Sequence, residues 1–114
     1  MIQEIWIPTP LPGSRQVYLK FRIRNAIDFP IVSVAFRAAL RDGRFHDARV
    51  VMGAVAPTPI RAREVERLLE GQAPHEKLAI EAGRLAVNNV QPLTRNKAKV
   101  EILKALVSKA IQMD

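Results

Sequence analysis

The sequence predicts an α+β domain in which a small antiparallel sheet of about three strands packs against about three helices. Three observations support this fold class. Apolar residues alternate in 31–40 and 48–54, an Asp42-Gly43 pair separates these segments, and the spacing of apolar residues becomes helical after Met52. The 114 residues, 48% hydrophobic and 25% charged, suit one core, so we expect residues 1–114 to form a single domain.

The two-residue alternation predicts a hairpin. In residues 31–40 the apolar side chains that would share one face are Val32, Val34, Phe36, Ala38 and Leu40. After Asp42-Gly43, a strong hairpin turn signal, the alternation resumes in Ala48, Val50, Met52 and Ala54. Upstream, residues 2–7 predict a short strand or an entry segment, followed by a loop in the Pro-rich stretch 8–13.

Three helices are expected after the hairpin. The first begins at Thr58-Pro59, where a capping hydroxyl precedes a proline at the first helical position, and it ends at Gly71. The second begins at Pro74, and the third is capped near Thr94. Their apolar faces comprise Ala62, Val65, Leu68 and Leu69, then Leu78, Ala82, Leu85, Ala86 and Val90, then Val100, Leu103, Val107 and Ala110.

The composition excludes several kinds of catalytic centre. The chain has no cysteine, and its two histidines, His46 and His75, stand far apart, so thiolate chemistry, iron–sulfur ligation and a self-contained metal site are not expected. The five glycines never cluster into a phosphate-binding loop. Acidic residues that come in near pairs are predicted to be solvated surface: Glu64, Glu66, Glu76 and Glu81. We therefore assign no catalytic residue.

The net charge of +7 and the pI near 10.6 leave two interpretations open. In the favoured one, dispersed bases form ordinary solvated surface. In the other, the chain is a basic nucleic-acid-binding module that uses Lys20, Arg22, Arg24, Arg37 and Arg41. Only one aromatic pair, Tyr18 and Phe21, accompanies these bases, whereas single-strand binders usually present several rings. With neither a membrane span nor a secretory signal in the sequence, we expect a cytoplasmic protein without a membrane partner.

Two stretches have an unusual composition. Residues 18–29 are dense in aromatic and basic side chains, and residues 53–62 contain the turn Ala56-Pro57-Thr58-Pro59-Ile60-Arg61-Ala62. Together with Ile5-Trp6-Ile7-Pro8, Glu66, Leu69 and Gly71, they resemble the C-terminal domain of the FAD-binding (medium) subunit of the xanthine dehydrogenase and carbon monoxide dehydrogenase family of molybdenum hydroxylases. The resemblance covers nearly the whole chain. The last helix, with Lys99-Val100 and Lys104, looks more like the xanthine dehydrogenase branch and leaves the substrate open.

The resemblance implies an oxidoreductase in which substrate is oxidised at a molybdopterin centre on a large subunit. Electrons would pass through iron–sulfur clusters to FAD and then to NAD or another acceptor. The implied partners are two upstream FAD-binding subdomains, absent from this chain, and the molybdopterin and iron–sulfur subunits. This domain would close over the flavin from one side, without holding FAD or catalysing a reaction alone. A purely structural docking domain that does not touch the flavin is the further alternative.

The resemblance assigns two cofactor-binding residues, Tyr18 near the isoalloxazine ring and Lys20 as a flavin-contacting ammonium. A tyrosine ring can stack on a flavin, and an ammonium favours the negative charge gained on reduction. From the residues alone, Tyr18 could simply pack on the hairpin and Lys20 could extend into water. For Thr58 and Arg61 we expect structural roles, a helix cap and an ion pair with an acid such as Glu64.

Overall fold

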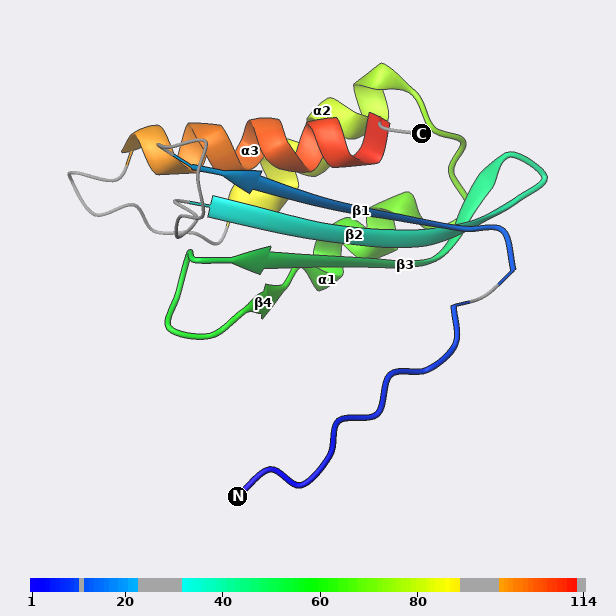
Figure 1. Cartoon of the computed structure of the whole chain (residues 1–114). Helices are drawn as coiled ribbons and strands as arrows, with labels where there is room; N and C mark the ends of the chain where they lie inside the picture. Colours follow the sequence, from blue (N-terminus) through cyan, green and yellow to red (C-terminus); the bar gives the residue numbers. More distant parts are fainter. Residues whose placement is uncertain (11, 23–31, 89–96, 113–114) are drawn as a thin grey trace.

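The computed structural model describes residues 1–10, 12–22, 32–88 and 97–112. A four-stranded antiparallel sheet in the order β1-β2-β3-β4 carries three helices on one face (Figure 1). The strands are β1 (Ser14–Phe21), β2 (Val32–Arg41), β3 (Arg44–Gly53) and β4 (Ile60–Arg61), and the helices are α1 (Arg63–Leu69), α2 (Glu76–Val87) and α3 (Lys97–Gln112). The predicted α+β class is confirmed, with one strand more than expected. None of these helices is long and apolar enough to cross a membrane.

β2 and β3 form the predicted hairpin. Arg41 pairs with Arg44, and the two residues between them, Asp42 and Gly43, have φ angles of 55° and 73°. Two positive φ angles give the type I′ turn, whose twist matches that of the flanking strands. β1 pairs with the other side of β2, and the short β4 pairs with β3.

A β-bulge interrupts the hairpin. The register between β2 and β3 shifts between Arg37 and Ala39, and Asp47 on the opposite strand has a φ of 54°. An extra residue on one strand reverses which positions face the core beyond it. Phe45 is therefore fully buried, although an alternation that starts at Ala48 does not predict it.

The leading segment is not a strand. Residues 1–10 lie outside all helices and strands and are exposed, so the strand alternative for residues 2–7 is wrong and the alternative of an entry segment holds. Pro8 and Pro10 lack the backbone donors that sheet pairing needs. The first strand is instead β1, which begins after Gly13.

The predicted start of the first helix is also wrong. Ile60 and Arg61 extend the sheet as β4, and the Ala62 amide donates to the Val50 carbonyl at 2.8 Å. Sheet pairing therefore continues past Thr58, and α1 starts only at Arg63, without a side-chain cap. The helix ends as predicted, since Gly71 follows it with a φ of 75°.

The other two helices bury the predicted faces with small shifts in their ends. α2 begins at Glu76, not at Pro74, because the His75 ring Nδ1 accepts a hydrogen bond from the Leu78 amide at 3.0 Å and caps the helix. Fully or nearly fully buried positions include Leu78, Ala82 and Ala86 in α2, and Leu103, Val107 and Ala110 in α3. The predicted cap at Thr94 and the apolar position Val90 lie outside the described residues.

One arginine ties the edge of the sheet to the last helix. The Arg15 guanidinium carbon on β1 lies 5.9 Å from the Phe36 ring centroid and 5.8 Å from that of Phe45. Its Nη2 donates to the Ile111 carbonyl at 2.5 Å, near the end of α3. The cation thus meets two ring faces and the negative end of a helix, both favourable environments.

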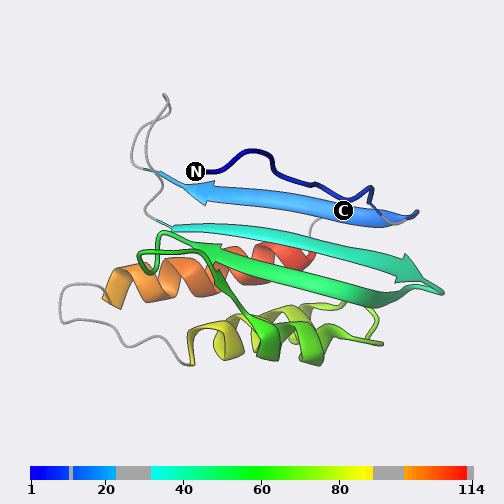
Figure 2. The same ribbon diagram turned by 90° about the horizontal axis from the view of Figure 1, so that it is seen from below.

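The helices leave the other face of the sheet uncovered in the part of the chain that the structure describes. Figure 2 views the molecule from this side, with strands passing in front of α3 and with α1 and α2 visible beyond the β3 edge. The core side chains of β2 and β3 all point toward the helices, and partly buried Val17 and Leu19 of β1 pack against the same cluster. The domain is therefore one-sided, with a second sheet face open to a partner.

A glycine sets the distance between α2 and α3. A Cβ on Gly83 would lie 2.7 Å from the backbone oxygen of Lys104 on α3, closer than such atoms approach. A backbone oxygen cannot rotate away, so the two helices would have to separate.

We predict that Gly83→Ala lowers the free energy of unfolding by about 1 kcal/mol. The helix propensity gained, about 1 kcal/mol, is outweighed by an overpacking cost of up to about 3 kcal/mol. Chemical denaturation measures this change. The control is Arg84→Ala, at the exposed next position of the same helix, which should change stability by less than about 0.5 kcal/mol. A Gly83→Ala variant more stable than the original chain would contradict the packing argument.

Candidate functional site

The two predicted cofactor-binding residues, Tyr18 and Lys20, lie on β1 and face away from the helices. Val17 and Leu19 pack against the core, so the alternation of a strand places their neighbours on the open face. Tyr18 is 62% exposed, and Lys20 is partly exposed. The structure therefore brings an aromatic ring and an ammonium to one accessible surface at the sheet edge.

A groove of 660 Å³ runs between the leading segment and the open sheet face. Its lining includes Ile7 and Pro8 on one side and Tyr18, Ala35, Arg37 and Val51 on the other. Lys20 does not line the groove; it lies two residues further along β1. Walls that are mostly apolar, with a few placed polar groups, are typical of sites that bind small organic ligands.

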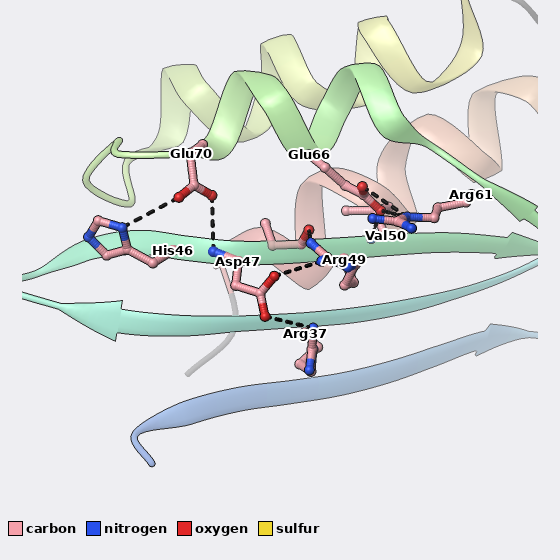
Figure 3. Close-up of polar contacts among 9 residues, drawn as sticks. Arg37, His46, Asp47, Arg49, Val50, Arg61, Glu66 and Glu70 are labelled. Carbon is pink, nitrogen blue, oxygen red and sulfur yellow. Dashed lines mark hydrogen bonds and ion pairs between the residues drawn. The ribbon is translucent and has the colours of Figure 1, made fainter. Parts of the chain in front are cut away.

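Two arginines on this face are held by the bulge. Figure 3 shows Asp47 between them: its Oδ2 accepts from Arg37 Nη2 at 3.1 Å, and its Oδ1 contacts Arg49 Nη2 at 2.7 Å. The positive φ of Asp47 aims its carboxylate at both cations, one from each strand. The bulge therefore fixes two guanidinium groups in place beside the groove. No pattern in the sequence identifies Asp47 and Arg49 as a unit, because an isolated Asp within a strand pattern does not indicate a bulge.

The acid that pairs with Arg61 is Glu66, not Glu64. Arg61 Nε donates to both Glu66 carboxylate oxygens, at 2.8 and 3.0 Å, and the Val50 amide donates to Glu66 Oε1 at 3.0 Å (Figure 3). Glu66 is only 7% exposed, so its prediction as solvated surface is wrong. A signal existed in the sequence. With Ala62, Val65 and Leu69 it completes the i, i+3, i+4, i+7 spacing of a buried helix face.

Burial raises the pKa of the Glu66 carboxyl, but other interactions outweigh it. Hydrogen bonds from Arg61 and from the Val50 amide lower that pKa, as do the charges of Arg61 and Arg49, and the net pKa lies below the ordinary value. The hydrogen bond to Glu66 in turn raises the pKa of the Arg61 guanidinium. The pair joins α1 to β3 and β4 and keeps Glu66 ionised.

Glu70 makes the second polar link from the end of α1 to β3. Its Oε2 accepts from the Asp47 amide at 3.0 Å, and its Oε1 lies 3.5 Å from His46 Nδ1 (Figure 3). The bulge amide at Asp47 is thereby satisfied by a helix side chain. Among the residues that the structure describes, no three His, Asp or Glu side chains gather in a way that could hold a metal ion.

We predict that Glu66→Gln lowers the free energy of unfolding by about 2 kcal/mol at neutral pH, the usual range for losing charge-assisted hydrogen bonds at a buried site. Because the folded-state pKa is depressed, the stability that Glu66 contributes is fully present above its ordinary pKa of 4.5 and is lost as the pH falls through the lower folded-state value.

Denaturation curves at neutral pH and at steps below 4.5 measure this difference. The difference in free energy of unfolding between the original chain and Glu66→Gln should become smaller as the pH falls. Glu81→Gln, at an exposed position of α2, serves as the control and should leave stability nearly unchanged. A difference that stays constant with pH would show that the carboxylate charge does not stabilise the fold.

Comparison with known proteins identifies the family. The family model of the CO dehydrogenase flavoprotein C-terminal domain matches residues 16–112. The chain is 27% identical over 116 aligned positions to the glyceraldehyde dehydrogenase medium chain of Sulfolobus acidocaldarius, covering 98% of this chain and 41% of that protein. It is 31% identical over 75 positions to a putative xanthine dehydrogenase FAD-binding subunit of Escherichia coli, covering 66% of this chain and 25% of that protein. This chain thus spans less than half the length of these curated relatives.

Solved structures share the fold. A reconstituted CO dehydrogenase from Oligotropha carboxidovorans superposes with a TM-score of 0.80 at 23% identity, over 93% of this chain and 38% of that one. Quinoline 2-oxidoreductase from Pseudomonas putida 86 superposes with a TM-score of 0.79 at 24% identity, over 90% and 37%. The family match covers all four strands except the start of β1, and all three helices. This chain belongs to the CO dehydrogenase flavoprotein C-terminal domain family, found in FAD-binding medium subunits of the molybdenum hydroxylases, as the resemblance in its sequence predicts.

Proposed function

We propose that this domain covers the flavin in the FAD-binding subunit of a molybdenum hydroxylase and that Tyr18 and Lys20 contact the flavin. The observation that carries the proposal is the position of both side chains on the one sheet face that no described helix covers. The relatives add support, since one of them is named as an FAD-binding subunit and another as a medium chain.

The chemistry of the open face fits a flavin cover. FAD would accept electrons from iron–sulfur clusters and pass them to an acceptor such as NAD. The exposed Tyr18 ring offers a flat surface for stacking. The Lys20 ammonium would favour the negative charge that the ring system gains on reduction. Both groups stand on a hydrogen-bonded strand, which keeps their backbone positions fixed.

The same face does not fit a complete FAD site. Dinucleotide phosphates are usually gripped by consecutive backbone amides in a glycine-rich loop at a helix start, and the sequence contains no such loop. We propose that upstream FAD-binding subdomains of the same subunit supply that grip and that molybdopterin and iron–sulfur subunits complete the enzyme. The relatives act on different substrates by their names, which fits a domain that meets the flavin and leaves substrate choice to another subunit.

The structure gives less support to the alternative of a nucleic-acid-binding module. Of its five basic residues, Arg37 is already paired with Asp47. A docking domain that leaves the flavin untouched remains distinct from our proposal in one respect only. The charge of Lys20 should affect the flavin midpoint potential if Lys20 contacts the flavin, and should not affect it if the domain only docks.

One prediction of this proposal concerns the isolated chain. It should neither bind FAD tightly nor reduce an acceptor, because phosphate-binding amides are missing from its sequence. Mixed with FAD-loaded segments of the same subunit, it should associate and change the flavin fluorescence. If the purified chain carried one flavin per molecule, the prediction that it does not bind FAD tightly would be wrong. No association at about 100 μM, where even a contact of roughly 5.5 kcal/mol would register, would contradict the predicted association.

Another prediction of this proposal concerns Lys20 in the reassembled subunit. Lys20→Met should lower the flavin midpoint potential by about 20–40 mV, which corresponds to ~1–2 kcal/mol for a two-electron couple. Removing the ammonium takes a favourable charge partner from the reduced anionic form, while an edge-strand position costs little core packing. Potentiometric titration of the flavin measures the shift, and thermal unfolding checks the fold.

Two further variants make this test specific. Lys109→Met removes an equal charge from the exposed side of α3 and should leave the potential unchanged. Leu103→Ala, at a fully buried position, should lower the free energy of unfolding by about 2–5 kcal/mol. If Lys20→Met keeps its flavin and its fold with an unchanged potential, Lys20 does not contact the flavin and the docking alternative holds.

A further inference from the structure

A second hollow lies at the opposite edge of the sheet from Tyr18 and Lys20. It is an open depression of about 260 Å³ where β3, β4 and α1 meet. Its lining is dominated by charged side chains, Arg49, Arg61, Arg63, Glu66, Arg67 and Glu70. The strand order places β1 and β4 at opposite edges of the sheet, roughly 14 Å apart by the usual strand spacing. The hollow shares Arg49 with the groove beside Tyr18, but Arg61, Arg63 and Arg67 lie outside that groove. The inference below does not rest on the flavin proposal.

Two of the four arginines are already matched to carboxylates. Arg49 Nη2 lies 2.7 Å from Asp47 Oδ1, and its Nη1 donates to the Ala48 carbonyl at 2.9 Å. Arg61 is held by both oxygens of Glu66. These contacts fix the two guanidinium groups in position, and each group has a carboxylate partner, although Asp47 is shared with Arg37.

The other two arginines have no such partner. Arg63 and Arg67 lie four residues apart on the exposed side of α1, and within the described ranges neither side chain makes a hydrogen bond or an ion pair. Like charges at this spacing destabilise a helix by about 0.2–0.5 kcal/mol. Glu70 does not relieve them, because its oxygens are directed to His46 and to the Asp47 amide. The hollow therefore carries two uncompensated positive charges beside two fixed ones.

We propose that this hollow binds a dianionic phosphate group. Two negative charges match the uncompensated Arg63 and Arg67, and the planar guanidinium forks suit the several oxygens of a phosphate. The volume exceeds that of one phosphate and leaves room for a substituent. A phosphomonoester, such as a nucleoside monophosphate, and free inorganic phosphate share this chemistry.

The test is an NMR titration of the 114-residue chain with inorganic phosphate and, separately, with adenosine monophosphate. Sodium chloride at matched ionic strength gives the background, since simple screening acts on all surface charges. Saturable shifts around α1 and β4 are expected with phosphate and not with chloride. Arg63→Gln and Arg67→Gln should each weaken binding about tenfold, by loss of one charge-assisted contact. Arg84→Gln on α2, outside the hollow, should bind as the original chain does.

Each outcome bears on the proposal. Tighter binding of the nucleotide than of phosphate would identify a phosphomonoester as the ligand, and equal binding would show that the phosphate group alone is recognised. Weaker binding when acid converts the phosphate to its monoanion would support the match to two charges. Shifts no larger than those from chloride, or equal affinity in the original chain and both arginine variants, would overturn the proposal. All three substitutions are at exposed positions, so circular dichroism should confirm an intact fold.

Discussion

The packing of three helices onto one face of a single sheet is the constraint from which the rest of this domain follows. β2 is central to it, because it pairs with β1 on one side and β3 on the other. Its residues Val32, Val34 and Phe36 are no more than 2% exposed. With one face closed in this way, each strand must present its alternate residues to the other side. Tyr18 and Lys20 lie together on the accessible face because they are alternate residues of β1.

The bulge at Asp47 adapts the hairpin to that one-sided core. It lets Phe45 join Phe36 in an edge-to-face contact, with ring centroids 5.7 Å apart, and it gives Arg15 two rings on which to lie. The same residue uses its carboxylate to hold Arg37 and Arg49 on the open face. The bulge thus positions side chains in the core and on the surface. Bulges are often found beside functional sites, where they redirect side chains.

Much of this architecture could be predicted from the sequence, where one periodic signal acted alone. The strand at β2, the Asp42-Gly43 turn, the end of α1 at Gly71 and the buried faces of α2 and α3 follow from period and turn chemistry. Two of the failures share one cause, namely tertiary pairing that overrides a local signal. Thr58-Pro59 has the chemistry of a helix start, but pairing with β3 draws the following residues into β4. Glu66 has the chemistry of a surface acid, but Arg61 and the Val50 amide make burial favourable.

The central claim is that the open sheet face meets the flavin, and hydroxyl-radical footprinting of Tyr18 tests it most directly. Tyr18 should be reactive in the isolated domain and protected when the domain is joined to FAD-loaded segments of the subunit. Protection should weaken when the same segments lack FAD, because the ring of the cofactor itself would cover the tyrosine. His75, exposed at the start of α2, should react equally in all three states. Unchanged reactivity of Tyr18 in a formed, flavin-loaded complex would contradict the account.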